Sequence, residues 1–357
     1  MSSKICIVST ANIKHMTLIS IYTTLLEKKG IEYDLIYLDR YGIDEETTAT
    51  NIYKYTTVSN KNTHKFFKLR RFLNFRKYAT KILRNNNYDL IIVWNTLTSL
   101  LLYNFLLKNK KKYILNIRDY YHEKNPLIYR LHKKLIENSL ITTISSQGFR
   151  SFLPDHDYIF VNSLNEKIID INSKTINEFN GIVNIGFLGN IRFYDQQIKL
   201  IEGLKNDSRF NLIYSGTNSE PLKQYVVNNS IDNCFFTGEF SPSETIEILS
   251  NFDIINNVFG NKSIAVQTLT SIRLYYSTIY KIPMLVSDKT HMSNIIDSFG
   301  LGFSIDLDSN NLADTIYNYF TKLEIEEYRN NTSLFNKKVQ RENQDFKNKF
   351  NNIVSAL

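Results

Sequence analysis

Short apolar runs of strand length alternate along this chain with amphipathic helical patterns, and the alternation occurs twice. The first round begins with the apolar run 4–8, continues with a helical pattern over 18–29, and returns to an apolar run over 33–38. The second round begins at 183–188. A strand, a helix and a strand in this order build a parallel sheet that helices cover. The sequence therefore predicts an α/β fold with two doubly wound domains.

The length of 357 residues also fits two domains better than a single core. We predict a first domain over 1–165 and a second over 182–325. Residues 166–181 are polar and have no clear period, which indicates a linker. Residues 326–357 are polar with a helical pattern and form a C-terminal tail. A dinucleotide fingerprint is absent, because no Gly-x-Gly-x-x-Gly follows the first strand.

Charge and cysteine content indicate the kind of partner and the compartment. Residues 1–170 contain 26 Lys and Arg against 15 Asp and Glu, whereas residues 171–357 contain 17 against 20. The first half is therefore the one expected to meet an anionic partner. Cys6 and Cys234 lie in different predicted strands, so we expect two buried thiols in a reducing cytosol. The longest apolar region, 97–107, is too short for a membrane span.

The segment 61–84 has nine Lys and Arg residues, no acidic residue and five interleaved aromatic residues. A basic helix with aromatic side chains suits an anionic membrane surface. It could also suit nucleic acid, or it could be a surface helix whose aromatic residues pack on its own sheet. The rest of the chain shows no nucleic-acid-binding module. We therefore predict contact with a membrane and none with nucleic acid.

The segment 270–288 predicts a short helix that Thr270 or Ser271 caps and that ends before Pro283. Arg273 then lies in the first helical turn, where a cation opposes the positive end of the helix dipole. An anion in front of the helix would remove this cost, because the backbone N–H groups and the guanidinium would share it. We interpret the segment as a phosphate site. The alternative is a helix end with a solvent-facing arginine.

The run 273–288, Arg-Leu-Tyr-Tyr-Ser-Thr-Ile-Tyr-Lys-Ile-Pro-Met-Leu-Val-Ser-Asp, resembles the donor-site segment of bacterial GT-B glycosyltransferases, especially family-4-like capsule and exopolysaccharide enzymes. In that family a Lys/Arg-Leu-Tyr-Glu run opens a helix that ends in Gly-x-Pro. Here Tyr276 replaces the Glu and Lys281 replaces the Gly. The resemblance extends loosely over most of the chain. It implies a GT-B fold, in which two Rossmann-like domains face a central cleft and the C-terminal tail crosses back to the first domain.

The resemblance also implies donor contacts at the strand ends of the second domain. The loop that begins at Gly189 resembles the one that meets the diphosphate, where glycine admits a close backbone approach and arginine neutralises phosphate. Two later strand ends resemble those that flank the nucleotide base. The predicted donor site consists of Gly189, Asn190, Arg192, Ser215, Gly216, Thr237, Gly238, Ser271, Ile272, Arg273 and Tyr276.

Acceptor chemistry is assigned to the first domain. The predicted strand 113–117 delivers Arg-Asp-Tyr-Tyr-His-Glu to a strand end, where α/β sheets place their ligands. Asp119, kept ionised by Arg118, could orient or deprotonate an acceptor hydroxyl, and so could His122. Alternatively, Asp119 caps the following helix or pairs with Arg118. By resemblance the acceptor side consists of Asn12, His15 and Arg118; His15 could equally be a solvated loop residue.

We therefore predict a glycosyltransferase that moves a sugar from a nucleoside-diphosphate-sugar to a glycan, lipid-linked, in capsule, exopolysaccharide or O-antigen synthesis. The expected location is cytoplasmic, at the inner face of the cell membrane. No metal or other cofactor is expected, because no residues have metal-ligand spacing and 306–308 reads as a turn. The resemblance implies retention at the anomeric carbon. The alternatives are a nucleotide-sugar epimerase and a non-catalytic GT-B-like partner subunit of a transferase.

Overall fold

The computed structural model describes residues 3–16, 18–58, 65–164 and 181–357. The chain forms two compact units, one made of residues 1–163 with 341–357 and the other of residues 164–340. The first unit ends close to the predicted boundary at 165. The predicted linker lies outside the described residues, apart from Gly181.

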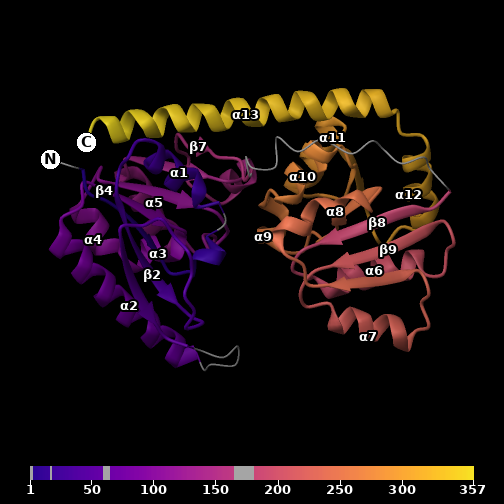
Figure 1. The fold of residues 1–357 in the computed structure, drawn as a ribbon, viewed down its shortest axis with the longest axis horizontal. Coiled ribbons are helices and arrows are strands. Elements are labelled where there is room, and N and C mark those ends of the chain that lie inside the picture. Colours follow the sequence, from indigo (N-terminus) through magenta and orange to yellow (C-terminus); the bar gives the residue numbers. More distant parts are fainter. Residues whose placement is uncertain (1–2, 17, 59–64, 165–180) are drawn as a thin grey trace. The chain divides into compact units, whose positions relative to one another are not determined.

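The first unit contains a parallel sheet with the strand order β3-β2-β1-β4-β5-β6-β7 (Figure 1). Its strands are β1 (Ile5–Ser9), β2 (Tyr33–Asp39), β3 (Asn51–Thr56), β4 (Leu90–Trp94), β5 (Tyr113–Ile117), β6 (Ile141–Ile144) and β7 (Ile159–Phe160). The central strands β1 and β4 are buried throughout, as expected for strands covered on both faces. The order reverses between β1 and β4, which makes their carboxyl ends the expected ligand site.

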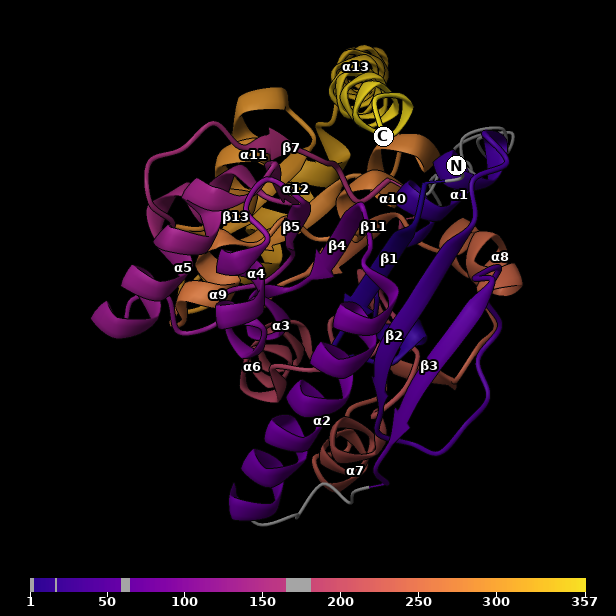
Figure 2. The same cartoon turned by 90° about the vertical axis from the view of Figure 1, so that its left-hand side faces the viewer.

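The helices of the first unit cover this sheet. They are η1 (Ile13–His15), α1 (Ser20–Lys28), α2 (Lys65–Asn86), α3 (Thr96–Leu101), α4 (Tyr103–Lys108), α5 (Pro126–Asn138) and η2 (Gln147–Ser151). Figure 2 shows α2 beside α3 and α4. On the α1 side, the Tyr22 ring packs edge-on against Phe346 and Phe350, with ring centroids 5.2 Å apart in both pairs. The C-terminal residues 341–357 are therefore part of this unit's core.

The second unit contains a parallel sheet with the order β10-β9-β8-β11-β12-β13. Its strands are β8 (Val183–Leu188), β9 (Phe210–Ser215), β10 (Cys234–Gly238), β11 (Ile254–Asn257), β12 (Met284–Ser287) and β13 (Gly302–Ile305). Its helices are α6 (Tyr194–Leu204), α7 (Glu220–Asn228), η4 (Pro242–Glu244), α8 (Thr245–Ser250), α9 (Ile264–Thr268), α10 (Arg273–Tyr280), α11 (His291–Phe299), α12 (Leu312–Thr321) and the first part of α13 (Ile325–Ser355). The order reverses between β8 and β11, so the same rule directs a ligand to their carboxyl ends.

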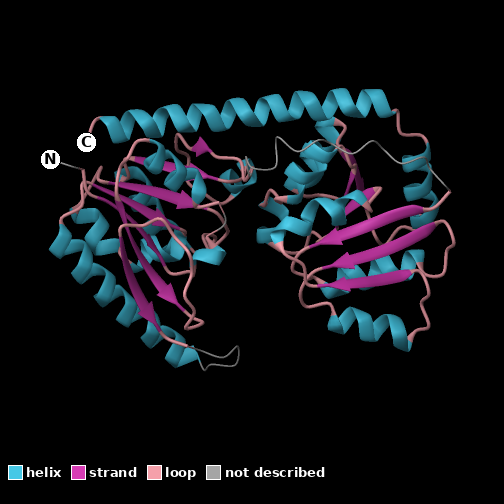
Figure 3. Ribbon diagram, in the orientation of Figure 1, coloured by secondary structure: helices cyan, strands magenta, loops and turns pink. Residues whose placement is uncertain are grey.

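The predicted fold class, two doubly wound parallel α/β domains, is confirmed. The sequence did not predict β3, an edge strand with no buried residue that therefore lacks a strong apolar signal. After Trp94 the chain forms two short helices, which meet at Leu102. The polar tail forms α13, one uninterrupted helix (Figure 3).

Both cysteines are buried and free, Cys6 in β1 and Cys234 in β10, and burial raises the pKa of each thiol. Within the described ranges, no helix combines the length and the apolar character that a membrane crossing needs.

Candidate functional site

Three glycine turns meet at the carboxyl edge of the second sheet. The N–H of Gly189, after β8, donates to the carbonyl of Ser215, with a nitrogen–oxygen distance of 2.8 Å, and the N–H of Gly216 donates to the carbonyl of Gly238 at 2.7 Å. Gly216 has φ 142°, and a Cβ atom there would lie 1.9 Å from the Gly189 carbonyl oxygen. Only glycine fits this turn, so the structure brings together the strand ends that the sequence assigned to the donor.

The polar side chains of these turns bond to one another. Thr237 Oγ1 donates to Ser215 Oγ at 2.9 Å, and Asn218 Nδ2 donates to Asn190 Oδ1 at 2.5 Å. These bonds fix the turns and leave Asn190 exposed beside them. Direct contact of Asn190, Ser215 or Thr237 with a donor remains a prediction.

Arg273 is the first residue of α10, and its side chain is only 7% exposed. Its Nε donates to the carbonyl of Leu188 at 2.7 Å, and its Nη1 donates to Asn257 Oδ1 at 3.3 Å. A Cβ atom added to Gly189 would lie 3.7 Å from Nη2. The guanidinium therefore lies at the ends of β8 and β11, beside the glycine turns. The alternative of a solvent-facing arginine is wrong.

Among the described residues, none supplies a charge that compensates Arg273. The guanidinium carbon lies 4.0 Å from the ring centroid of Phe187 and 5.2 Å from that of Phe259, and no described carboxylate forms an ion pair with it. Burial, and to a smaller extent the exposed Arg192, lower the pKa of Arg273 to about 9. A buried cation without an acidic partner is costly, and a bound anion removes that cost.

The start of α10 agrees with the predicted cap at Ser271. The helix is assigned from Arg273, with Ile272 directly before it. Ser271 Oγ accepts the N–H of Arg273 at 3.3 Å, so the serine side chain caps the first turn. Ile272 and Tyr276 are partly buried and pack on an apolar cluster, and burial raises the pKa of Tyr276. Their roles toward a donor remain predictions.

Lys281 stands where the resembled donor-site segment has glycine, and its backbone conformation explains why glycine suits this position. Lys281 follows α10 with φ 58° and ψ 40°, a left-handed conformation, and its N–H donates to the carbonyl of Ser277. Glycine adopts this conformation most easily at a helix end, and lysine adopts it here at some cost.

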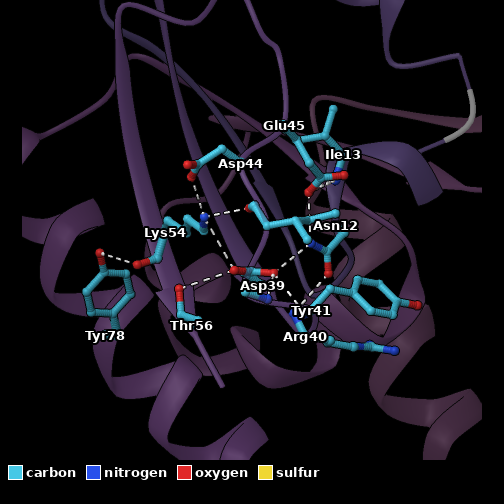
Figure 4. A network of polar contacts seen from close by, with 12 residues as sticks. Asn12, Ile13, Asp39, Arg40, Tyr41, Asp44, Glu45, Lys54, Thr56 and Tyr78 are labelled. Atoms are coloured by element: carbon cyan, nitrogen blue, oxygen red, sulfur yellow. Dashed lines mark hydrogen bonds and ion pairs between the residues drawn. The ribbon is translucent and has the colours of Figure 1, made fainter. Parts of the chain in front are cut away.

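In the first unit, Asn12 belongs to a buried polar network (Figure 4). Its Nδ2 donates to Asp39 Oδ1 at 2.9 Å and to Glu45 Oε2 at 2.8 Å, while its Oδ1 accepts the N–H of Arg40 at 2.9 Å. These bonds use all the hydrogen-bonding groups of the side chain except one lone pair. Asn12 thus holds the loops after β1 and β2, and acceptor contact by this residue remains a prediction.

Asp39 is the buried charge of that network, with no exposed side-chain surface. Its carboxylate also accepts the N–H groups of Tyr41 and Gly42 and lies 3.5 Å from the Lys54 ammonium. Burial alone would raise the pKa of Asp39, but these donors outweigh it and hold the pKa at about 2. The charge is fully compensated within the unit.

The predicted acceptor residues lie at strand ends of the same sheet. His15 Nε2 lies 2.8 Å from the Tyr41 hydroxyl, and Arg118 Nη2 donates to Ser163 Oγ at 2.7 Å. Asp119 and His122 are exposed in the loop after β5. The capping alternative for Asp119 is wrong, because α5 is capped by Asn125, whose Oδ1 accepts the N–H groups of residues 127 and 128.

A buried acid–base pair lies beneath this loop and was not predicted. Glu123 Oε1 and His132 Nδ1 are 3.8 Å apart, both side chains are 1% exposed, and the Glu123 carboxylate accepts the N–H of Tyr121 at 2.5 Å. Burial raises the pKa of Glu123 and lowers the pKa of His132 to about 3, so burial disfavours the charged form of each side chain. No sequence spacing signals this pair, because it forms only when α5 packs against the loop.

Other residues around the site were also not predicted. Asn257, Phe187 and Phe259 surround Arg273. Asp39 ends β2, and Arg40 follows it. Polar residues at the end of an apolar strand were a usable signal for Asp39, Arg40 and Asn257. Within the described part of the chain, no group of three or more His, Cys, Asp or Glu residues is arranged to hold a metal ion.

No protein-family model and no curated protein matches the sequence. Solved structures of similar fold include sucrose-phosphate synthase from Thermosynechococcus elongatus, with a TM-score of 0.72, 11% identity and coverage of 99% of this chain and 100% of that one. A glycosyltransferase from Rickettsia africae has a TM-score of 0.65, 15% identity and coverage of 98% of each chain. Anabaena HepE in complex with UDP has a TM-score of 0.66, 10% identity and coverage of 99% and 100%. The chain therefore has the GT-B fold.

Proposed function

We propose that this protein is a glycosyltransferase with a nucleoside-diphosphate-sugar as its donor. The observation that supports it most is Arg273, a buried cation without a described acidic partner, beside the turn at Gly189. A diphosphate supplies the missing negative charge. Anabaena HepE, which has a similar fold, was solved with UDP and with UDP-glucose, which agrees with this donor class.

In the proposed reaction, the bond between the anomeric carbon and the diphosphate oxygen breaks, and its electron pair leaves with the diphosphate. Arg273 and Arg192 stabilise that developing charge. An acceptor hydroxyl forms the new bond to the anomeric carbon and gives its proton to Asp119 or His122. The family-4 resemblance favours retention of the anomeric configuration.

Calorimetry with UDP and GDP tests the donor site. Loss of a charge-assisted hydrogen bond costs roughly 1.5–3 kcal/mol, so Arg273→Ala is expected to raise the dissociation constant about ten- to hundredfold. Arg209→Ala is the matched control, because Arg209 pairs with Asp207 and Asp314 in the same unit. Equal affinities of Arg273→Ala and the unmodified protein would remove Arg273 from the site.

Two further measurements address the chemistry. Because guanidinium groups stabilise the leaving diphosphate, we expect activity to persist in EDTA; a loss restored by Mn²⁺ or Mg²⁺ would contradict this.

Asp119→Asn is expected to lower turnover much more than donor affinity, since its carboxylate acts on the acceptor. If turnover is unchanged, His122 and not Asp119 is the proton acceptor.

An epimerase acting on the nucleotide-sugar itself is the second candidate. A structure described as a putative UDP-N-acetylglucosamine 2-epimerase from Listeria monocytogenes has a similar fold, with a TM-score of 0.56 and 10% identity. Incubation with single nucleotide-sugars separates the two activities. Slow release of the free sugar and nucleoside diphosphate indicates a transferase, whereas a new nucleotide-sugar epimer indicates an epimerase. If neither product forms, a non-catalytic partner subunit is favoured.

The proposed acceptor is a glycan on a lipid carrier, and α2 supports this. The buried residues Phe75, Ala79 and Leu83 face its own unit, so Phe75 packs as the alternative of a surface helix on its own sheet predicted. Near its N-terminal end, four apolar side chains are between 43% and 62% exposed: Phe66, Phe67, Leu69 and Leu73.

An open groove of about 830 Å³ runs along α2, and residues 101, 102, 104 and 105 line it as well. Its charged lining residues are all cationic: Arg70, Arg76, Lys77, Lys81 and Arg84. Cations beside exposed apolar side chains suit an anionic bilayer. The protein would then act at the inner face of the cell membrane.

Liposome flotation tests this location. Each Lys or Arg near an anionic surface contributes about 1 kcal/mol, and added salt screens the attraction. We expect binding to anionic vesicles at low salt and little to neutral ones. Charge reversal to Glu at Arg70, Lys77, Lys81 and Arg84 is expected to abolish it. The control reverses four other exposed lysines of this unit: Lys28, Lys110, Lys124 and Lys134. Equal loss in both variants would show that no defined face is used.

A further inference from the structure

Two arginines from distant parts of the first unit meet at one aromatic ring. Arg40 follows β2, and Arg71 lies in the second turn of α2. Their guanidinium carbons lie 5.8 Å and 5.3 Å from the ring centroid of Phe72. Burial, and then the neighbouring Arg71, lower the pKa of Arg40. The fold therefore holds two like charges close together in a partly buried position, which needs a reason.

Arg40 is held in place but is not neutralised. Its N–H is bound by Asn12, and its Nη2 donates to the carbonyl of Thr10 at 2.8 Å. Its Nε is buried and has no hydrogen-bond partner among the described residues. None of the described carboxylates forms an ion pair with Arg40.

The nearest acidic side chains are already occupied. Asp39 is bound by Asn12, by two backbone N–H groups and by Lys54. Glu45 accepts from Asn12 and from the N–H groups of Ile13 and Lys14 (Figure 4). Neither carboxylate is available to Arg40 without breaking this network.

The arginine pair, Arg40 and Arg71, lies at the functional edge of its sheet. Arg40 directly follows the carboxyl end of β2, and its guanidinium reaches the carbonyl of Thr10, just after β1. Ligands of doubly wound sheets bind at this edge. Lys14, over the Tyr41 ring at 3.9 Å, adds positive potential nearby. This edge belongs to the first unit, whereas Arg273 belongs to the second.

We propose that the arginine pair binds a phosphate group of the acceptor, a phosphomonoester or a diphosphate. A planar guanidinium presents parallel N–H donors that match phosphate oxygens. The identity of the ligand as the acceptor rests on the proposed function; the anion site itself does not. The phosphate belongs either to a lipid diphosphate or to a phosphorylated sugar.

Calorimetry of the full chain with inorganic pyrophosphate tests the anion site, with saturating UDP present to occupy the donor site. We expect pyrophosphate to bind, and Arg40→Gln and Arg71→Gln each to raise its dissociation constant about tenfold or more. Lys134→Gln, an equal charge change at an exposed position of α5, is expected to leave it unchanged. Arg40→Lys, which keeps the charge, is expected to recover part of the affinity. This recovery would show that Arg40→Gln weakens binding through the lost charge and not through a loss of folding.

The outcomes distinguish this inference from the proposed function. Absence of pyrophosphate binding, or binding that neither arginine substitution weakens, would overturn the anion site. If UDP does not bind, the proposed donor fails, and the same titrations on the Arg273→Ala background still test the arginine pair. Titrations with farnesyl diphosphate and with glucose 6-phosphate then identify the source. If binding of either compound depends on Arg40, the arginine pair binds an acceptor phosphate. If binding of neither compound depends on Arg40, the acceptor role is overturned.

Discussion

Asp39 in the first unit and Arg273 in the second are both buried charges at the carboxyl edge of a parallel sheet, but their surroundings are opposite. Asp39 receives hydrogen bonds from Asn12 and two backbone N–H groups and lies beside Lys54. Arg273 has two neutral acceptors, two aromatic rings and a second cation, Arg192, nearby. A charge compensated by its own unit stabilises the fold, whereas an uncompensated one is suited to a ligand.

Removal of Asp39 is expected to have the largest effect on stability. Asp39→Ala leaves several buried donors and the Lys54 charge without their partner, and breaking a buried charged network of this kind costs about 3–5 kcal/mol. Urea denaturation measures this loss. UDP affinity is expected to stay unchanged, because the network lies in the first unit. A loss below about 1 kcal/mol would mean that the network is relaxed or hydrated and that the comparison fails.

Replacement of Arg273 is expected to act on binding and not on stability. Arg273→Met keeps most of the side-chain volume and removes a buried, uncompensated cation, so the free energy of unfolding is expected to change by less than about 1 kcal/mol or to increase. UDP affinity is expected to fall about ten- to hundredfold. Urea denaturation and calorimetry measure the two effects. A large loss of stability with unchanged affinity would assign Arg273 to the structure alone.

Acid titration sharpens the same comparison. The folded-state pKa of Asp39 is about 2, below its ordinary value of 3.8. The carboxylate therefore contributes stability above about pH 4 and loses it as the pH falls through 2, a difference of about 2 kcal/mol. We expect the unmodified protein to lose this much more stability than Asp39→Asn between pH 4 and pH 2. Parallel acid curves for the two proteins would contradict the assignment.

Asp44 provides the smallest expected effect. It forms an ion pair with Lys54 at 2.9 Å, as Asp39 does at 3.5 Å, but its side chain is fully exposed. Surface ion pairs contribute little, because water and salt screen them. Asp44→Ala is therefore expected to leave the urea midpoint unchanged within error. A shift comparable to that of Asp39→Ala would show that Lys54, and not burial, controls the network.

The sequence alone determined the parallel α/β architecture and the strand ends that carry glycine and polar residues. Buried strands and amphipathic helices leave a local pattern of apolar residues, which can be read without knowledge of the fold. The assignment of Gly189, Gly216, Gly238 and Arg273 to one donor site came instead from the resemblance to GT-B glycosyltransferases, and their contact with a donor remains a prediction. The polar edge strand β3 was missed, because pairing with β2 and not an apolar pattern defines it.

Only the tertiary structure decided which charges are compensated. The burial of Arg273 depends on Phe187 in β8 and on Phe259 in the loop after β11. The pairing of Glu123 with His132 depends on how α5 packs. The arginine pair joins residues 40 and 71 at Phe72. Such contacts leave no periodic signal in the sequence, since chain folding over long separations brings the residues together, and burial then sets the energy of each charge.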